Sequence, residues 1–205
     1  TKPLVYDNLV IFGAWDKNLY ALDKKTGKEV WKWHEGKPGR FYSAAAVWPV
    51  AANGKVFIAD PERALTAIDA STGKTVWRTK ESMVRETVGL SEDKRRIYSK
   101  TMNDSVVCYS TTTDFPEKIW ASNVGFGYEH APSMPVEKEG VVFGSTKNGL
   151  MFGLDAHTGK VLWKHKVGNS LISTLVPLSK NKCLFTATGG EIGLLVIDYK
   201  INKHK

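Results

Sequence analysis

Polar residues stand just ahead of small residues in three separate segments of this chain, and a fourth segment adds a weaker candidate; the residue types could bind or transform a polar ligand. The segments are GRFYSAAAV (39–47), SMVRETVGL (82–90), GFGYEHAPSM (125–134) and GNSLISTLV (168–176). The candidate ligand-binding residues in them are Arg40, Tyr42, Arg85, Glu86, Tyr128, Glu129, His130 and Asn169. Two arginines favour a carboxylate or phosphate through bidentate pairing, and Glu129 with His130 could act as acid and base.

A second interpretation needs no ligand. Arg85 could form a salt bridge with Glu129, and His130 could be a capped turn residue. The choice depends on which elements carry these residues and on whether the fold brings them together. The sequence leaves both interpretations open.

Other reactive constellations are poorly supported. The histidines, which are residues 34, 130, 157, 165 and 204, do not cluster at metal-ligand spacing. Neither HExxH nor GxxxxGK[ST] occurs. Cys108 and Cys183 lie far apart without a CxxC partner, so they could pair only if the fold joins them. We therefore expect no metal site and assign no catalytic residue.

Composition narrows the class of protein. The 205 residues are 42% hydrophobic and 24% charged, which is typical of a globular protein. No apolar run approaches the 18 residues that predict a membrane span. The net charge of +8 comes mostly from lysines scattered through turns, so we expect no nucleic-acid partner. Because the chain starts at Thr1, we expect it to be part of a longer or processed protein.

One phrase returns along the chain. YALDKKTGKEVWKW (20–33) resembles TAIDASTGKTVWRT (66–79) and FGLDAHTGKVLWKH (152–165). Aligned on their tryptophans, Trp31, Trp77, Trp120 and Trp163 are 46, 43 and 43 residues apart. A period near 43 residues is typical of helix pairs in solenoids or of four-stranded propeller blades.

The segments within each period favour strands. They are short, rich in Val, Ile, Phe, Tyr, Thr and Trp, and broken by Gly, Asn, Asp and Pro. In the second repeat we expect strands near 43–51, 55–60, 64–69 and 74–79. The fold class is thus all-β, a partial β-propeller of about four and a half four-stranded antiparallel blades. We expect one domain, 1–205, with blades near 1–35, 40–80, 83–122, 128–167 and a partial blade at 171–201.

The shared phrase predicts a turn followed by a packing residue. The Asp23 carboxylate can accept backbone amide hydrogen bonds, and Gly27 can take a positive φ at little cost. Trp31, four residues later, is suited to filling the seam between neighbouring sheets. The structural repeat residues are Asp23, Gly27, Trp31, Asp69, Gly73, Trp77, Trp120, Asp155, Gly159 and Trp163.

Two repeats depart from this pattern. Repeat three has Ser110 in place of the aspartate, lacks the glycine, and has a loop two residues longer, but it keeps Trp120. We expect a different loop there on the same kind of sheet. Repeat five ends without a tryptophan strand.

With these motifs, ALDKKTGKEVW, AIDASTGKTVW and GLDAHTGKVLW, the chain resembles the pyrroloquinoline-quinone (PQQ) repeat family of β-propellers over essentially its whole length. In such a propeller the first strand of each blade lines a central channel, and the four polar segments would meet at one mouth of it. Members commonly have seven or eight blades. The resemblance therefore implies further blades or self-association to complete this ring.

The resemblance implies several functions. We expect a non-catalytic binding or scaffold module of a larger exported bacterial protein, in the periplasm or at the cell surface, without a cofactor. Its partner would be a protein or a polar or anionic small ligand. One alternative is part of a PQQ-dependent dehydrogenase, but the adjacent cysteines and calcium-binding Glu, Asn and Asp of those enzymes have no counterpart motif here. Another is an accessory propeller of a phosphoesterase or serine/threonine kinase.

Overall fold

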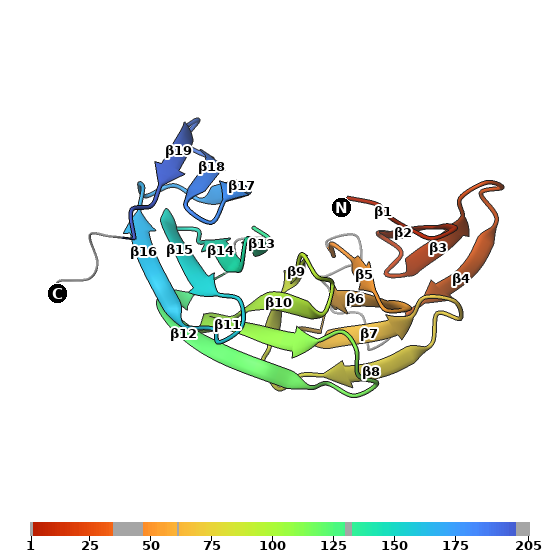
Figure 1. Cartoon of the computed structure of the whole chain (residues 1–205). Coiled ribbons are helices and arrows are strands. Elements are labelled where there is room, and N and C mark those ends of the chain that lie inside the picture. Colours follow the sequence, from red (N-terminus) through yellow and green to blue (C-terminus); the bar gives the residue numbers. More distant parts are fainter. Residues whose placement is uncertain (1, 35–46, 61, 130–132, 200–205) are drawn as a thin grey trace.

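The computed structural model describes residues 2–34, 47–60, 62–129 and 133–199, apart from the side chain of Glu86. These residues form five antiparallel sheets, four with four strands and one with three (Figure 1). Blade one contains β1 (Leu4–Tyr6), β2 (Leu9–Gly13), β3 (Leu19–Asp23) and β4 (Glu29–Trp33). Blade two contains β5 (Val50–Ala52), β6 (Lys55–Ala59), β7 (Leu65–Asp69) and β8 (Thr75–Thr79).

The remaining blades follow in chain order. Blade three contains β9 (Val84–Leu90), β10 (Arg96–Thr101), β11 (Asn103–Ser110) and β12 (Lys118–Tyr128). Blade four contains β13 (Val136–Lys138), β14 (Val141–Ser145), β15 (Leu150–Asp155) and β16 (Val161–Lys166). Blade five contains β17 (Ile172–Ser179), β18 (Lys182–Ala187) and β19 (Ile192–Val196).

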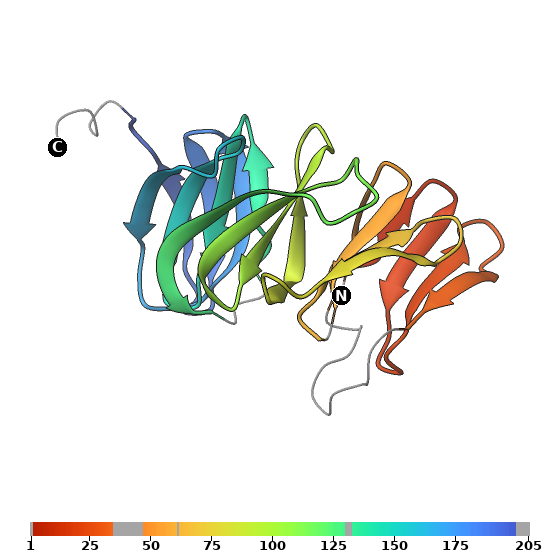
Figure 2. The same ribbon diagram turned by 90° about the horizontal axis from the view of Figure 1, so that it is seen from below.

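The blades form an open arc. Within each sheet, neighbouring strands are also consecutive in the chain. In Figure 1 the first strands lie toward the inside of the arc, the fourth strands lie outside, and the arc is open between blade one (red) and blade five (blue). Figure 2 shows the five sheets beside one another in chain order. This arrangement confirms the predicted all-β partial propeller.

Because neighbouring strands run in opposite directions, the arc has two different sides along the strand direction, which we call the front end and the turn end. At the front end the first strand of each blade begins, and the second strand turns into the third. At the turn end the third strand turns into the fourth, which is where the repeated Asp-x-x-Thr-Gly phrase lies.

The predicted turn chemistry is confirmed. Oδ1 of Asp69 accepts hydrogen bonds from the backbone N of Thr72 (2.8 Å) and from its Oγ1 (2.8 Å). Gly73, at φ +71°, donates its backbone N–H to the Asp69 carbonyl over 2.9 Å. The turns at Asp23 and Asp155 have the same bonds. The aspartate thus fixes the turn that leads into the tryptophan strand.

The tryptophans of the repeat fill the seams between blades. Trp31, Trp77, Trp120 and Trp163 are all buried. Nε1 of Trp31 donates to the Ala70 carbonyl of the next blade (2.8 Å), and Nε1 of Trp120 donates to the Ala156 carbonyl (3.1 Å). Trp33, which the repeat does not single out, adds a bond from Nε1 to Thr75 Oγ1 (3.0 Å).

A β-bulge precedes each of these tryptophans. In blade one Ala21 pairs with Trp31 and Leu22 with Glu29, so Val30 has no partner in the ladder. The same skip occurs before the other tryptophans, at Val76, Ile119 and Leu162. An extra residue in one strand re-aims the side chain beside it. The bulge therefore helps to turn the indole toward the next blade.

Blade three differs from the others as its sequence predicts. A loop over 111–117 replaces the repeated turn, closed by a bond from Ser110 N to the Glu117 carbonyl (3.0 Å), and Trp120 keeps its seam position. The blade also runs to Tyr128 rather than to about residue 122. Its extension is held by Asp104 Oδ1, which accepts from Gly127 N (2.6 Å), and by the pairing of Asn103 with Tyr128.

Neighbouring seams should not respond equally to loss of the indole N–H. Within the described residues Nε1 of Trp77 is buried without a hydrogen-bond partner, whereas Nε1 of Trp31 bonds to Ala70. Trp31→Phe leaves that carbonyl unpaired, so it should cost about 1–2 kcal/mol more than Trp77→Phe. Urea unfolding of both variants would check this difference, and equal costs would contradict it.

The turn aspartates should make the fold sensitive to acid. Hydrogen bonds from the backbone and then the side chain of Thr26 lower the pKa of Asp23, and the Ser71 hydroxyl is the largest cause of the lowered pKa of Asp69. A carboxyl whose pKa is lower in the folded state stabilises the fold at pH values above its unfolded-state pKa of about 3.9. That stabilisation is lost as the pH falls through the folded-state pKa. Urea midpoints should therefore drop below about pH 4. Ser71→Ala should flatten that drop, and an unchanged profile would contradict the assignment.

Candidate functional site

The front end carries those predicted ligand-binding residues whose side chains are described. Arg85 lies on β9, Tyr128 ends β12, Glu129 follows it, and Asn169 lies between β16 and β17. Arg40, Tyr42 and His130 lie outside the described residues, and Glu86 is described only by its backbone in β9. Three of the four polar segments are partly strand, since β9 covers 84–90, β12 includes 125–128 and β17 begins at Ile172.

Arg85 and Glu129 meet around Met102, at the turn between β10 and β11. Nη1 of Arg85 contacts Met102 Sδ at 3.6 Å, and the backbone N of Glu129 donates to the Met102 carbonyl (3.0 Å). Arg85 is 7% exposed and Glu129 is fully buried. Both side chains are therefore buried.

The turn between β14 and β15 links the other candidates. The backbone N of Lys147 donates to Glu129 Oε2 (3.0 Å), and Lys147 Nζ lies 5.0 Å from the centroid of the Tyr128 ring. A Cβ on Gly149 would come within 3.2 Å of the backbone N of Asn169. The structure thus brings Tyr128, Glu129 and Asn169 around one turn of blade four.

Sequence reasoning missed this turn and Met102. The signal for the turn was Asn148-Gly149, a dipeptide typical of tight turns. Nothing in the local sequence marked Met102, because the residues that contact it, Arg85 and Glu129, are distant from it in the chain. A ligand could contact the exposed Tyr128 ring and the ammonium group of Lys147. Anion binding by Arg85 stays a prediction.

Large apolar side chains are exposed around the same end. Trp15 (81%) lies in the turn after β2, Met83 (56%) precedes β9, and Tyr128 (56%) ends β12. Trp48 (37%) precedes β5 and lines a cavity of about 220 Å³ with residues of blade one and with Met134. This mostly apolar hollow lies near the starts of β1, β5 and β13.

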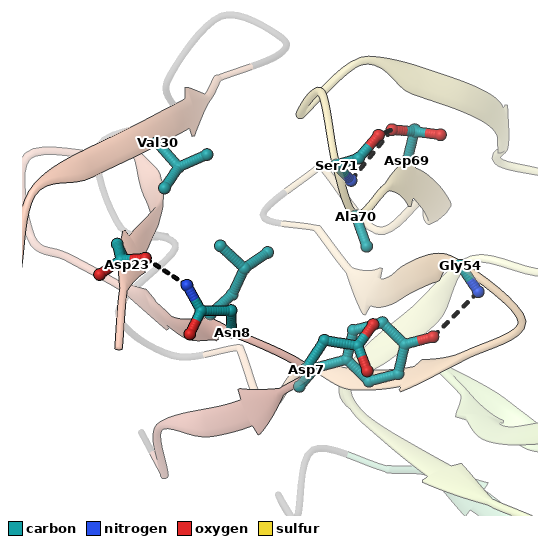
Figure 3. Close-up of a pocket in the computed structure, with 10 residues that line it drawn as sticks. Asp7, Asn8, Asp23, Val30, Gly54, Asp69, Ala70 and Ser71 are labelled. Carbon is teal, nitrogen blue, oxygen red and sulfur yellow. Dashed lines mark hydrogen bonds between the residues drawn. The ribbon is translucent and has the colours of Figure 1, made fainter. Parts of the chain in front are cut away.

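A larger cavity, of about 500 Å³, lies at the turn end between blades one and two (Figure 3). It is lined by Tyr6, Asp7, Asn8, Leu9, Asp23, Val30, Gly54, Asp69, Ala70 and Ser71. Its polar groups bond to one another: Asn8 Nδ2 donates to Asp23, and Tyr6 Oη accepts from Gly54 N (3.0 Å). Asp23 and Asp69 already hold their turns, so the hollow is best explained as part of the seam.

The two cysteines lie in separate sheets of the structure. Cys108 is buried in β11 and Cys183 in β18, both as free thiols in separate apolar clusters. Burial raises the pKa of the Cys183 thiol to about 11 and that of Cys108 further. Within 2–34, 47–60, 62–129 and 133–199, no three His, Cys, Asp or Glu side chains gather as metal ligands.

Comparison with known families decides what kind of propeller this is. A family model described as outer membrane protein assembly factor BamB matches residues 16–114 and 103–202. The chain belongs to this family of PQQ-repeat propellers. A comparison with curated proteins finds no match. In the described part of the chain, no helix has the length and apolar character needed to cross a membrane.

Two solved structures have a fold similar to that of this chain. BamB from Moraxella catarrhalis matches with a TM-score of 0.71 at 17% identity, over 95% of this chain and 56% of that one. The computationally designed Ika8 protein matches with a TM-score of 0.77 at 17% identity, over 95% of this chain and 57% of that one. The chain therefore spans just over half the length of these relatives.

Proposed function

We propose that this chain is a non-catalytic protein-binding module that holds a partner at its front end. The observation that supports this most directly is the exposure there of Trp15, Met83 and Tyr128, with Trp48 beside a small apolar hollow. Tryptophan, tyrosine and methionine are enriched in protein interfaces, and tryptophan and tyrosine often dominate their binding energy.

The charges around this surface suit a protein better than a small metabolite. Lys147 Nζ lies over the Tyr128 ring, while Arg85 and Glu129 are buried. Buried charges position the surface, and the exposed aromatics are left for contact. The matching family, an outer membrane protein assembly factor, supports a role as a scaffold in an exported bacterial assembly.

Site-specific photo-cross-linking in the producing cell tests the proposal. A benzoylphenylalanine at position 15 or 128 should give a discrete protein adduct. The control is position 115, since Phe115 is 60% exposed but lies at the turn end. Adducts from the front end alone support the proposal.

Three results would overturn it. These are the absence of protein adducts at 15 and 128, equal adducts at 115, or calcium-dependent quenching of tryptophan fluorescence by PQQ in the purified chain. The last result would favour the dehydrogenase alternative.

A further inference from the structure

The turn end carries a second hollow, in the seam between blades three and four, away from the front end where we place the protein partner. It has a volume of about 380 Å³, which is within the range of small-ligand sites. We call it the polar hollow, because charged and hydroxyl-bearing side chains form most of its wall. Among them are Asp93, Arg95, Arg96, Thr112, Glu117 and His157.

The polar hollow lies where the repeat departs from its pattern. The aspartate of the repeated turn is replaced by Ser110 in blade three, which pairs with Arg96 in the ladder as Asp69 pairs with Lys55 in blade two. Ser110 Oγ accepts a hydrogen bond from the backbone N of Thr112 (3.2 Å). The turn therefore keeps a side-chain acceptor but loses the negative charge that the repeat places here.

Two of the charged groups on the wall are already committed to the protein. Arg96 is 8% exposed, and its guanidinium lies 3.2 Å from the Asp93 carboxylate and 3.8 Å from that of Glu137. Asp93 also accepts hydrogen bonds from the Ser91 hydroxyl (2.6 Å) and from the backbone N of Arg95 (3.0 Å). These contacts hold the seam, so Arg96 and Asp93 have little charge left for a ligand.

Arg96 also determines which nitrogen of His157 carries the proton. Nη1 of Arg96 lies 2.7 Å from Nδ1 of His157. Because an arginine N–H can only donate, Nδ1 accepts this bond and the proton of the neutral imidazole lies on Nε2. The exposed His157 ring therefore brings a hydrogen-bond donor to the hollow. The hydroxyl groups of Ser110 and Thr112, 3.0 Å apart, add further polar groups on the side of blade three.

Two opposite charges in the polar hollow are left over. Arg95 and Glu117 are both exposed, and within the described residues neither side chain forms an ion pair or a hydrogen bond. Their backbones lie on either side of residues 110 and 111, since Thr111 N donates to the Arg95 carbonyl (3.1 Å) and Ser110 N to the Glu117 carbonyl (3.0 Å). Neighbouring strands are about 4.8 Å apart, so the two side chains start about 10 Å from each other. A ligand between them would meet a cation on one side and an anion on the other.

We propose that the polar hollow binds a small zwitterion of the α-amino acid type. Its carboxylate would accept hydrogen bonds from Arg95 and from Nε2–H of His157, and its ammonium group would lie against Glu117. A ligand with a single charge would leave one charge of the hollow unmatched, so charge complementarity favours a dipolar ligand. Ile119, which is exposed and also lines the hollow, offers an apolar contact for a side chain.

Three ligands that share one carbon skeleton test the proposal. L-leucine carries both charges, isocaproate lacks the amino group, and isoamylamine lacks the carboxylate. Titrated into the isotope-labelled chain, L-leucine should shift the amide signals of Arg95, Thr112 and His157 with a dissociation constant on the order of 1 mM. Each analogue should bind at least about tenfold more weakly, because it loses a hydrogen bond between charged groups.

Substitutions in the chain separate the two charges. Arg95→Gln and Glu117→Gln should each weaken L-leucine binding about tenfold, and both should fold because the side chains are exposed. The control is Glu29→Gln, which removes an exposed carboxylate from β4 and should leave binding unchanged. Ser110→Asp restores the aspartate of the repeat and should abolish binding, because its carboxylate would repel that of the ligand.

The proposal is overturned if residues 95, 112 and 157 show no saturable shift up to about 10 mM L-leucine. It is equally overturned if isocaproate or isoamylamine binds as tightly as L-leucine, since the hollow would then recognise only one charge. A third contradicting result is a Glu29→Gln variant that loses as much affinity as Arg95→Gln. None of these results bears on the protein partner, whose surface is at the opposite end of the blades.

Discussion

Replacing Trp77 by alanine should lower the free energy of unfolding by about 3–5 kcal/mol, the usual cost of truncating a buried aromatic residue. Trp77 is 5% exposed and lies between the rings of Phe57 and Tyr109, with centroids 5.9 Å and 6.3 Å away. Truncation would leave a cavity between blades two and three, which cannot collapse without moving both sheets.

The chain contains its own control for that experiment. Trp15 is 81% exposed, so Trp15→Ala should change the free energy of unfolding by no more than about 0.5 kcal/mol. Urea unfolding followed by circular dichroism measures both variants. A cost below about 1 kcal/mol for Trp77→Ala would count against its role in the seam.

Gly159→Ala should also lower the free energy of unfolding strongly, for two separable reasons. Its φ of +73° disfavours a side chain, and a Cβ there would come within 2.7 Å of Trp120. Overpacking of this kind typically costs about 1–3 kcal/mol. Gly140→Ala measures the backbone cost alone, because nothing lies within 4 Å of that position.

A double-mutant cycle identifies the contact responsible. In a Trp120→Ala background, Gly159→Ala should cost little more than Gly140→Ala, because the clashing ring has gone. If the excess cost of Gly159→Ala persists in that background, the indole is not its cause.

The sequence predicts local structure well where a short segment contains all the residues that determine it. Asp69, Thr72 and Gly73 define a turn by their own side-chain and backbone chemistry, and three of the strands expected in repeat two begin and end within one residue of the prediction. Trp77 is predicted to be buried because a large apolar side chain at a fixed place in every repeat needs a seam.

The remaining features depend on residues distant in the chain. The bulge at Val76 is invisible in an alternating apolar segment, and the extension of β12 rests on Asp104 contacting Gly127. The gathering of Tyr128, Glu129 and Asn169 around Lys147–Gly149 joins segments of three blades. Contacts of this kind follow from the packing of blades, which no local pattern contains.

The interior and end blades also differ in a way that bears on cooperativity. In β6 and β14 every residue is buried, whereas in β2 and β18 the buried residues all lie on one side of the strand. In an array that is stabilised by nearest neighbours, each interior unit has two interfaces and each end unit has one. Opening should therefore begin at blades one and five and move inward. Studied on its own, the arc should respond as a linear chain of coupled units, with amide hydrogen exchange that slows with distance from blades one and five.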